Sequence, residues 1–393
     1  MISIRQTIAV TLMNLRAIPA RWGSSLVICI GIAGVVAVLT AVLAMATGLE
    51  GTLSSAGRPD RALVLSGGAI AEPLSALTPA AEAAIESAPG IARRANGQSA
   101  VSPEVLISVT LPRKETGMRS SVLVRGITDT GYEVHPEIKI VEGRTFTKGL
   151  REIVVGRGAA RQFADLATGA RASFLSGDWT IVGLFESNGD AHESEILADA
   201  QTLMSAAQRS VFSAATVRLE STDAFERFSS ALQKDPTLKV DVKRETDYYQ
   251  EQAKGVAAVL DVIAHAIGAI MALGAVFGAL NTMYAAVAVR NVEIATLRAV
   301  GFGALPVLVS VLIEGLALAL IGAAAGALVA WILFNGHAFS SGGTFSQIAV
   351  KLHIGADLVA TGVAWATVIG LIGGLLPAIR AARLPVAASL RAV

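Results

Sequence analysis

Four long apolar segments constrain this chain more than any other feature. They cover residues 23–49, 255–289, 306–334 and 358–379. Each has at least the roughly 20 consecutive apolar helical residues that are needed to cross the hydrocarbon core of a bilayer. Hydrophobic residues make up 53% of the chain and charged residues 16%, too apolar a balance for an ordinary water-soluble protein. We therefore predict an α-helical membrane protein with four transmembrane helices.

The first segment has two possible uses, a cleavable signal or a retained anchor. A small-residue pattern, Ala44-Met45-Ala46, resembles a cleavage site. However, the apolar part of a signal peptide is about 7 to 15 residues long, and this segment continues well past that length. Retention as a membrane-spanning helix is therefore predicted.

Residues 1–22 are predicted to form an amphipathic helix on the cytoplasmic membrane surface, the alternative being an ordinary cytoplasmic stub. Apolar residues recur at helical spacing, at Ile4, Ile8, Leu12 and Leu15. Pro19 and Arg21 would mark the bend into the first span.

The orientation follows from basic residues beside the spans, because Lys and Arg translocate poorly. These residues are Arg5, Arg16 and Arg21 before the first span, Arg290 and Arg298 after the second, and Arg380, Arg383 and Arg391 after the fourth. With four spans they all lie on one side, so both termini are predicted to be cytoplasmic. Residues 50–254 and 335–357 would then lie outside.

Residues 50–254 have the composition of an independently folding external domain. Short β-like runs are predicted at 61–65, 105–111, 121–126, 152–155, 179–185 and 216–219, and helices at 79–87, 159–164, 200–207 and 222–233. This mixture predicts an α+β domain. Segments 112–117 and 188–195 are expected to be exposed loops.

Several features of this domain could be mistaken for chemistry. The run Leu65-Ser66-Gly67-Gly68 begins like an ABC ATPase signature, but no G-x-x-x-x-G-K-[ST] phosphate loop occurs, so a turn after a strand explains it. One group of residues could ligate a metal, but its spacing matches no defined metal site. That group is Asp190, His192, Glu193 and Glu195. We therefore predict no metal site and no catalytic residue.

The overall charge and the cysteine content exclude two further classes of protein. A net charge of +1 gives no positive excess with which to hold nucleic acid. The one cysteine, Cys29, can form neither a disulfide framework nor a cysteine-based zinc site within this chain.

A short charged helix is predicted after the second span, at residues 290–301. It places Ile294 and Leu297 on one side, with charges around them, and Gly301 can end it in a left-handed turn. A short amphipathic helix on the cytoplasmic face suits docking to a partner. The alternative is a positively charged loop that only fixes the topology.

The sequence here resembles the MacB/FtsX-type permease family of ABC transporters, whose members share R-x-x-E-I-x-x-L-R-A-x-G at this position. The similarity continues in order through external segments 124–127, 141–144, 152–156 and 180–185, the small-residue-rich third span from Glu314 to Gly326, and the closing segment 376–391. One departure is Ala295, where the family often has Gly. Alanine is also a small residue.

The resemblance implies a permease subunit of a bacterial inner membrane, not an enzyme. It would work with a separate cytoplasmic ABC ATPase dimer and with a second copy or a paralogue. ATP and Mg²⁺ would be bound by that ATPase, and this chain would hold no cofactor. The short helix would be the coupling helix, with candidate residues Arg290, Glu293, Ile294, Leu297, Arg298 and Gly301. ATP-driven closure would push through this helix and the long second span to move the external domain.

The resemblance leaves three functions open. One is efflux, in which a periplasmic adaptor and an outer-membrane channel receive the substrate. Another is lipoprotein release of the LolC/LolE type. The third is non-transporting signalling of the FtsX type, although FtsX-like proteins usually carry a much smaller external domain.

Three polar residues within the spans are candidate sites. Glu314 at membrane depth is costly alone and is expected to face a partner or a cavity. Asp261 and His265 lie one turn apart near the outer end of the second span and are expected to mark the water boundary. The small-residue pairs Gly274/Gly278 and Gly322/Gly326 suit close helix packing, with dimer packing as their natural use.

Overall fold

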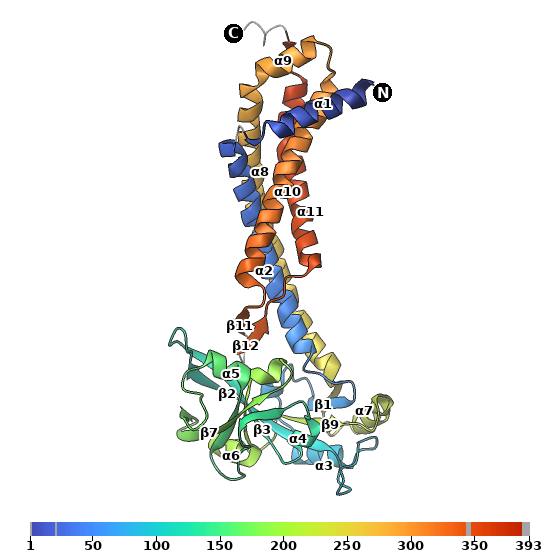
Figure 1. The fold of residues 1–393 in the computed structure, drawn as a ribbon. Coiled ribbons are helices and arrows are strands. Elements are labelled where there is room, and N and C mark those ends of the chain that lie inside the picture. Colours follow the sequence, from blue (N-terminus) through green and yellow to red (C-terminus); the bar gives the residue numbers. More distant parts are fainter. Residues whose placement is uncertain (1, 20–21, 343–346, 387–393) are drawn as a thin grey trace. The chain divides into compact units, whose positions relative to one another are not determined.

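A computed structural model describes residues 2–19, 22–342 and 347–386 of the chain. They divide into two compact units (Figure 1). The helical unit comprises Met1–Thr47, Ala258–His337 and Leu352–Val393, and the sheet unit comprises Gly48–Ala257 with Ala338–Lys351. Arg21 and Arg391, on which the predicted orientation partly rests, lie outside the described residues.

Among the described residues, four helices are long and apolar enough to span a bilayer. They are α2 (Trp22–Ser54), α8 (Glu245–Val289), α10 (Ala304–Phe334) and α11 (Ala356–Ala382). The other helices of this unit are α1 (Ile2–Arg16) and α9 (Asn291–Ala299). The prediction of four apolar helices is therefore confirmed.

Helix α8 begins ten residues before the predicted boundary at residue 255. Hydropathy placed that boundary, but the polar residues 245–254 include good helix formers. Glu245 and Asp247 also lie in the first turn, where acidic side chains favour the positive end of the helix dipole. The 45 residues extend for about 68 Å at 1.5 Å per residue, about twice the thickness of a bilayer core.

Helix α1 turns its predicted apolar stripe away from the protein. Ile4, Ile8 and Leu12 are about half or more exposed, whereas Val10 and Asn14 are buried against the rest of the helical unit. A helix lying on lipid requires this distribution, because its apolar face enters the membrane.

Small residues let the helices of this unit approach closely. A Cβ atom on Gly322 would lie 2.9 Å from the Cys29 carbonyl oxygen, and one on Gly326 would lie 2.4 Å from that of Ala33. The prediction that this pair serves dimer packing is therefore wrong, since its faces are filled by α2 of the same chain. At Gly274 and Gly278 of α8, no described atom lies within 4 Å of an added Cβ.

The sheet unit is built on one mixed sheet, which over the described residues has ten strands in the order β10-β1-β9-β2-β3-β8-β5-β7-β4, with β6 beside β7. The strands are β1 (Arg61–Ser66), β2 (Val101–Pro112), β3 (Arg119–Ile127), β4 (Lys139–Gly143), β5 (Glu152–Gly156), β6 (Arg171–Phe174), β7 (Gly177–Glu186), β8 (Ile196–Asp199), β9 (Ala214–Arg218) and β10 (Val240–Arg244). Pairs β3–β8 and β5–β7 are parallel, and the other pairs are antiparallel. The predicted α+β class is confirmed.

Short helices cover this sheet. They are α3 (Pro79–Ser87), α4 (Gly131–Val134), α5 (Arg157–Gln162), α6 (Ala200–Ala206) and α7 (Phe225–Gln233), with one-turn helices η2 (Glu72–Leu74), η3 (Ala191–Ser194) and η4 (Thr222–Ala224). The long strand β2 contributes to two apolar cores, through Val101 to one and through Val105 to the other. Gly68, with φ of +80°, follows β1 in a turn, as the run at 65–68 predicted.

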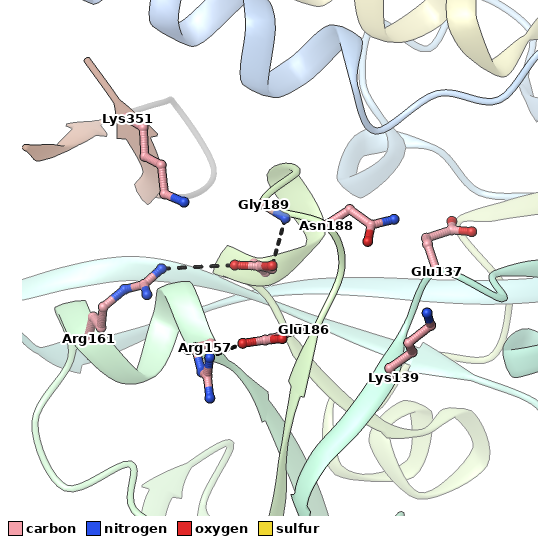
Figure 2. Close-up of a pocket in the computed structure, with 9 residues that line it drawn as sticks. Glu137, Lys139, Arg157, Arg161, Glu186, Asn188, Gly189 and Lys351 are labelled. Carbon is pink, nitrogen blue, oxygen red and sulfur yellow. Dashed lines mark hydrogen bonds and ion pairs between the residues drawn. The ribbon is translucent and has the colours of Figure 1, made fainter. Parts of the chain in front are cut away.

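A hairpin between α10 and α11 also belongs to the sheet unit. It consists of β11 (Ala338–Gly342) and β12 (Gln347–Lys351). The backbone N–H of Ala349 donates a 2.9 Å hydrogen bond to the Ser194 hydroxyl of η3. Lys351, at the end of β12, lines one pocket together with Arg161 and Gly189 (Figure 2).

Candidate functional site

Helix α9 ends as its sequence predicts. Gly301 follows it with φ of +107°, a left-handed conformation that favours glycine. The N–H of Phe302 donates a 3.1 Å hydrogen bond to the Leu297 carbonyl. This six-residue closure is the Schellman type of helix end, which satisfies a carbonyl that would otherwise have no partner.

The candidate residues of α9 divide between two faces. Ile294 is buried in the core of the helical unit, and Leu297 and Arg298 are half-buried. Glu293 has a side chain that is 49% exposed, and Val292 and Val300 beside it are 41% and 75% exposed. One face of α9 therefore holds the helix in place, while the other is open to a partner.

Arg290, directly before α9, is the centre of a polar cluster that is buried except for Glu293. Its Nη1 lies 3.2 Å from Glu314 Oε2 of α10, and its Nε lies 3.2 Å from Glu293 Oε2. Its Nη2 also donates to the side-chain oxygen of Asn14 in α1. Asn14 in turn donates a 2.5 Å hydrogen bond to the hydroxyl of Ser310 in α10. We call these five residues the Arg290 cluster.

The Arg290 cluster explains how a carboxylate is tolerated inside α10. A lone buried acid is costly, and a hydrogen-bonded cation offsets that cost. The Glu314 and Arg290 side chains are 7% and 9% exposed, so their charges are shielded from water together. The cluster thereby joins α1, the start of α9 and α10.

Sequence reasoning selected three members of this cluster and missed Asn14 and Ser310. Both are neutral and lie far in sequence from Arg290, so no charge or spacing pattern marks them. The available signal was that Asn14 lies off the apolar stripe of α1, where a polar contact with the protein is possible.

Two further hydrogen bonds hold the end of α9. The Nη1 of Arg298 donates a 2.8 Å hydrogen bond to the Leu384 carbonyl, in the segment after α11. The amide of Gln6 in α1 lies 3.4 Å from the Gly301 carbonyl. Helix α9 is thus held at both ends.

Asp261 and His265 lie in a different part of α8. His265 Nδ1 is 2.9 Å from the Asp261 carbonyl oxygen, and both side chains are about half exposed. The imidazole ring lies beside Trp365 of α11, with 6.0 Å between ring centroids. His265 precedes Arg290 by 25 residues of sequence, or about 38 Å of helix. The structure therefore does not bring this pair to Glu314.

The sheet unit contains a second polar network, which is buried. Arg125 on β3 binds three carboxylates, with Nη1 2.8 Å from Glu72 and 2.6 Å from Glu104. Its Nε and Nη2 form a two-point contact with Glu195, at 2.7 and 2.9 Å. All four side chains are at most 8% exposed. Such fork-shaped contacts are the strongest arrangement between guanidinium and carboxylate.

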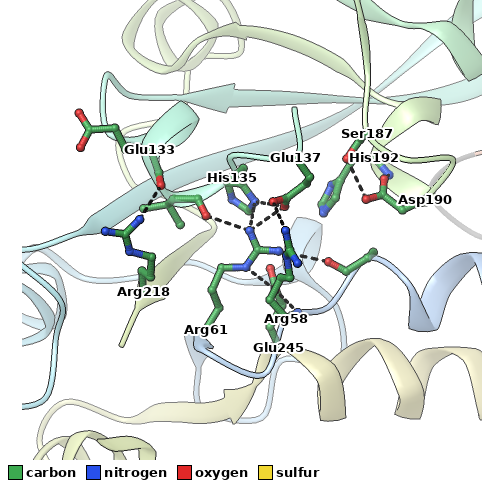
Figure 3. A network of polar contacts seen from close by, with 12 residues as sticks. Arg58, Arg61, Glu133, His135, Glu137, Ser187, Asp190, His192, Arg218 and Glu245 are labelled. Carbon is green, nitrogen blue, oxygen red and sulfur yellow. Dashed lines mark hydrogen bonds and ion pairs between the residues drawn. The ribbon is translucent and has the colours of Figure 1, made fainter. Parts of the chain in front are cut away.

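Arg61 on β1 is the second cation of this network, and Figure 3 shows it between His135, Glu137 and Glu245. Its Nη1 lies 2.7 Å from Glu137, and its Nε lies 2.6 Å from Glu245 in the first turn of α8. Since the Nη1 group can only donate, His135 Nδ1 accepts at 3.0 Å, and its Nε2 donates to Glu104 at 2.9 Å. The base of α8 is therefore tied to the sheet by a buried ion pair.

The prediction of an exposed loop at residues 188–195 is wrong. Asp190, His192 and Glu195 are buried, and η3 forms within this segment. The charges suggested a solvated loop, but their partners are distant in sequence. Burial opposes the charged form of His192, yet the Glu195 and Asp190 carboxylates outweigh it and raise its pKa to about 9. Burial likewise opposes ionisation of Glu195, but Arg125 and His192 lower its pKa to about 2.

A metal ion has one candidate site among the described residues, formed by His135, His192 and Glu245. Their ligand atoms lie within 4.8 Å of one another. However, the His135 and Glu245 atoms already receive hydrogen bonds from Arg61, whose charge would repel a metal. The chemistry of the group thus favours the guanidinium that occupies it.

Comparison with known proteins gives two family matches in the order of the sequence. The MacB-like periplasmic core domain matches residues 23–235, and the FtsX-like permease C-terminal domain matches residues 266–386. Among curated proteins, none matches the chain.

Two solved structures are similar to the chain. The periplasmic region of MacB from Actinobacillus actinomycetemcomitans has 15% identity and a TM-score of 0.37, covering 50% of this chain and 92% of that one. The extracellular domain of the noncanonic ABC-type transporter YknZ from Gram-positive bacteria has 15% identity and a TM-score of 0.35, covering 47% and 99%. Because the first family match alone spans more than half of the sequence, the chain belongs to the MacB/FtsX-type family of ABC transporter permeases, multi-pass proteins of the cell membrane.

Proposed function

We propose that this permease subunit transmits the work of a separate cytoplasmic ABC ATPase to the sheet unit on the outer side of the membrane. ATP and Mg²⁺ would be bound by that ATPase, and this chain would be non-catalytic. The movement would enter at α9, pass along α8 and displace the sheet unit. The result would be export of a substrate, or its extraction from the outer leaflet or the periplasm.

The observation that carries this proposal is the division of α9 into two faces. Its inner face is fixed by Ile294 and the Arg290 cluster, so a push on the helix reaches α8 and α10. Its outer face exposes Val292, Val300 and about half of the Glu293 side chain to a groove on a partner. Short amphipathic helices bind grooves in this manner.

Helix α8 supports the second step. It is continuous for 45 residues, and its first turn is anchored in the sheet unit by the Arg61–Glu245 pair. In the same turn, Tyr248 and Tyr249 are buried, and the Tyr248 hydroxyl accepts a 3.1 Å hydrogen bond from the Glu72 N–H. A rigid helix that is fixed at its outer end can carry a displacement over its whole length.

A second permease copy or a paralogue is the expected partner within the membrane. Only 17% of the most apolar stretch of α8 is buried within the chain, against 39% for that of α2. The open faces at Gly274 and Gly278 lie on the same helix and would let another helix approach closely.

The finer function is proposed as transport, with efflux or lipoprotein release as its two forms. An efflux system would add a periplasmic adaptor and an outer-membrane channel. The sheet unit, at Gly48–Ala257, is large for a subunit that only signals, in the manner of FtsX. Depletion of the chain separates the two forms: lipoproteins that accumulate in the inner membrane indicate release, and drug or lipid sensitivity with normal lipoproteins indicates efflux.

Co-purification from native membranes tests the ATPase partner. We expect an ABC ATPase to be retained by the wild-type chain and lost from Glu293→Lys, because the charge on the open face of α9 is reversed. Glu142→Lys on the exposed strand β4 is the control and should retain the ATPase. A chain that binds no ATPase in detergent or in nanodiscs would contradict the proposal.

A further inference from the structure

A pocket of about 390 Å³ lies on the sheet unit. Its cations come from separate elements: Lys139 from β4, Arg157 and Arg161 from α5, and Lys351 from β12 of the hairpin. Figure 2 shows these side chains around the loop that carries Asn188 and Gly189. The pocket also has three acidic residues, so its affinity for an anion depends on how the protein engages each carboxylate.

The three acids are already engaged by donors of the protein. Glu186 pairs with Arg157. Glu193 Oε1 accepts hydrogen bonds from the N–H groups of Gly189 at 2.7 Å and Ser187 at 3.0 Å. Glu137 Oε1 accepts from Arg61, at 2.7 Å. Glu137 shares its Arg61 partner with Glu245, and Glu193 accepts only from neutral N–H groups at these distances. With four cations and three acids in the lining, the pocket has a net charge of +1.

Three of the four cations, Lys139, Arg161 and Lys351, form few or no ion pairs among the residues that the structure describes. Within the described part of the chain, neither Lys139 nor Lys351 forms an ion pair with an acidic side chain. Arg161 has one long contact, 3.9 Å from Glu193 Oε2. Like charges gathered on one concave surface raise the local concentration of an oppositely charged ligand.

We propose that this pocket binds the phosphate group of a small headgroup, through Lys139, Arg161 and Lys351. Its volume of about 390 Å³ is within the roughly 300–1,000 Å³ of small-molecule sites, which exceeds one inorganic phosphate and suits a phosphorylated headgroup. The pocket shares no residue with α9, the proposed ATPase contact, and its ligand can be measured on this chain without any ATPase. The proposal thus goes beyond the transport function.

The ligand would also fasten the hairpin to the sheet unit. Lys351 lies on β12, which the unit holds beside η3 through the Ala349–Ser194 hydrogen bond. A phosphate shared by Lys351 and Arg161 would add a charged bridge between the hairpin and α5. Hairpin position and ligand binding would then be linked, so each would stabilise the other.

The test uses the full chain in detergent, with pyrophosphate as a soluble probe and calorimetry as the readout. We expect Lys139→Gln and Lys351→Gln each to weaken binding about fivefold to tenfold, since each removes one charge contact. Lys234→Gln, on the exposed end of α7, should bind like the wild type. Unchanged melting temperatures would show that the variants are folded, and Lys139→Arg should restore binding.

Competition identifies the source of the phosphate. Displacement of pyrophosphate by glycerophosphoglycerol but not by inorganic phosphate would support a lipid headgroup, and displacement by both would support a free phosphate compound. Absence of pyrophosphate binding would overturn the proposal. Equal binding by Lys351→Gln and Lys234→Gln would also overturn it, because the hairpin would then have no part in the site.

Discussion

Replacing Arg125 by methionine tests whether the buried network holds the sheet unit together. The substitution keeps the bulk of the side chain but leaves Glu72, Glu104 and Glu195 without their shared cation. Their side chains are 5%, 0% and 8% exposed, so water cannot compensate. Breaking one buried pair in this way costs about 3–5 kcal/mol, and here three carboxylates lose their partner. That is a large part of the 5–15 kcal/mol that typically stabilises a domain.

Thermal unfolding measures this loss. A change of 1 kcal/mol shifts the melting temperature by about 2–4 °C in a unit of this size, so we expect a decrease of about 10 °C or more. Trp179 is fully buried in the sheet unit and serves as the reporter once the other three tryptophans are replaced by phenylalanine.

Arg144→Met is the matched control. Arg144 pairs with Glu152 at 2.6 Å, but its side chain is 55% exposed, and exposed pairs contribute about 0–1 kcal/mol. We expect a decrease of a few degrees at most. If Arg125→Met unfolds at the same temperature as Arg144→Met, the reasoning about burial is refuted.

Three further predictions concern a titrating group, helix packing and the intramembrane pair. Since the pKa of His192 is raised from 6.5 to about 9, its contribution to stability is complete below pH 6.5 and is lost as the pH rises through 9. The melting temperature reported by Trp179 should therefore fall over that range, and it should fall less in His192→Gln; equal slopes would contradict this. Gly326→Leu should destabilise the helical unit by at least about 1–3 kcal/mol, because its side chain would meet the backbone of α2. Gly278→Leu should leave the stability of the monomer unchanged and weaken self-association. Equal thermal stability of the two monomers would argue against this packing. Glu314→Leu should destabilise by about 3–5 kcal/mol and the double variant with Arg290→Met by less, as seen in detergent melting curves. Additive losses would exclude coupling between the two charges.

The sequence alone predicted the elements that one local pattern determines. The apolar runs located α2, α8, α10 and α11, and the Gly301 position predicted the end of α9. The strand prediction located β1, β2, β3, β5, β7 and β9. It missed the four- and five-residue strands β4, β6, β8, β10, β11 and β12. Such short strands are stabilised by their neighbours in the sheet and show no pattern of their own.

The buried networks could not be predicted, because their partners are distant in sequence. Glu245 lies 184 residues from Arg61, and Glu195 lies 70 residues from Arg125. Charged residues are usually exposed, so the segment at 188–195 was interpreted as a loop in water. The same holds for Asn14, whose contact with Arg290 spans 276 residues.

The two glycine pairs, Gly322/Gly326 and Gly274/Gly278, show that residue spacing does not identify a packing partner. Both pairs have the same spacing, which indicates close helix packing but not which helix packs there. The structure fills the faces of the first pair with α2 and leaves those of the second open among the described residues. Spacing therefore predicted the type of contact, and the three-dimensional arrangement assigned its partner.

Labelling from one side of the membrane tests the central claim most directly, namely that the sheet unit and α9 lie on opposite faces. In a Cys29→Ser background, which has no other cysteine, Met118→Cys and Val300→Cys place single thiols at positions that are 65% and 75% exposed. A membrane-impermeant maleimide applied to intact spheroplasts should label Met118→Cys at once and Val300→Cys only after permeabilisation. Labelling of both thiols from the same side would contradict the account.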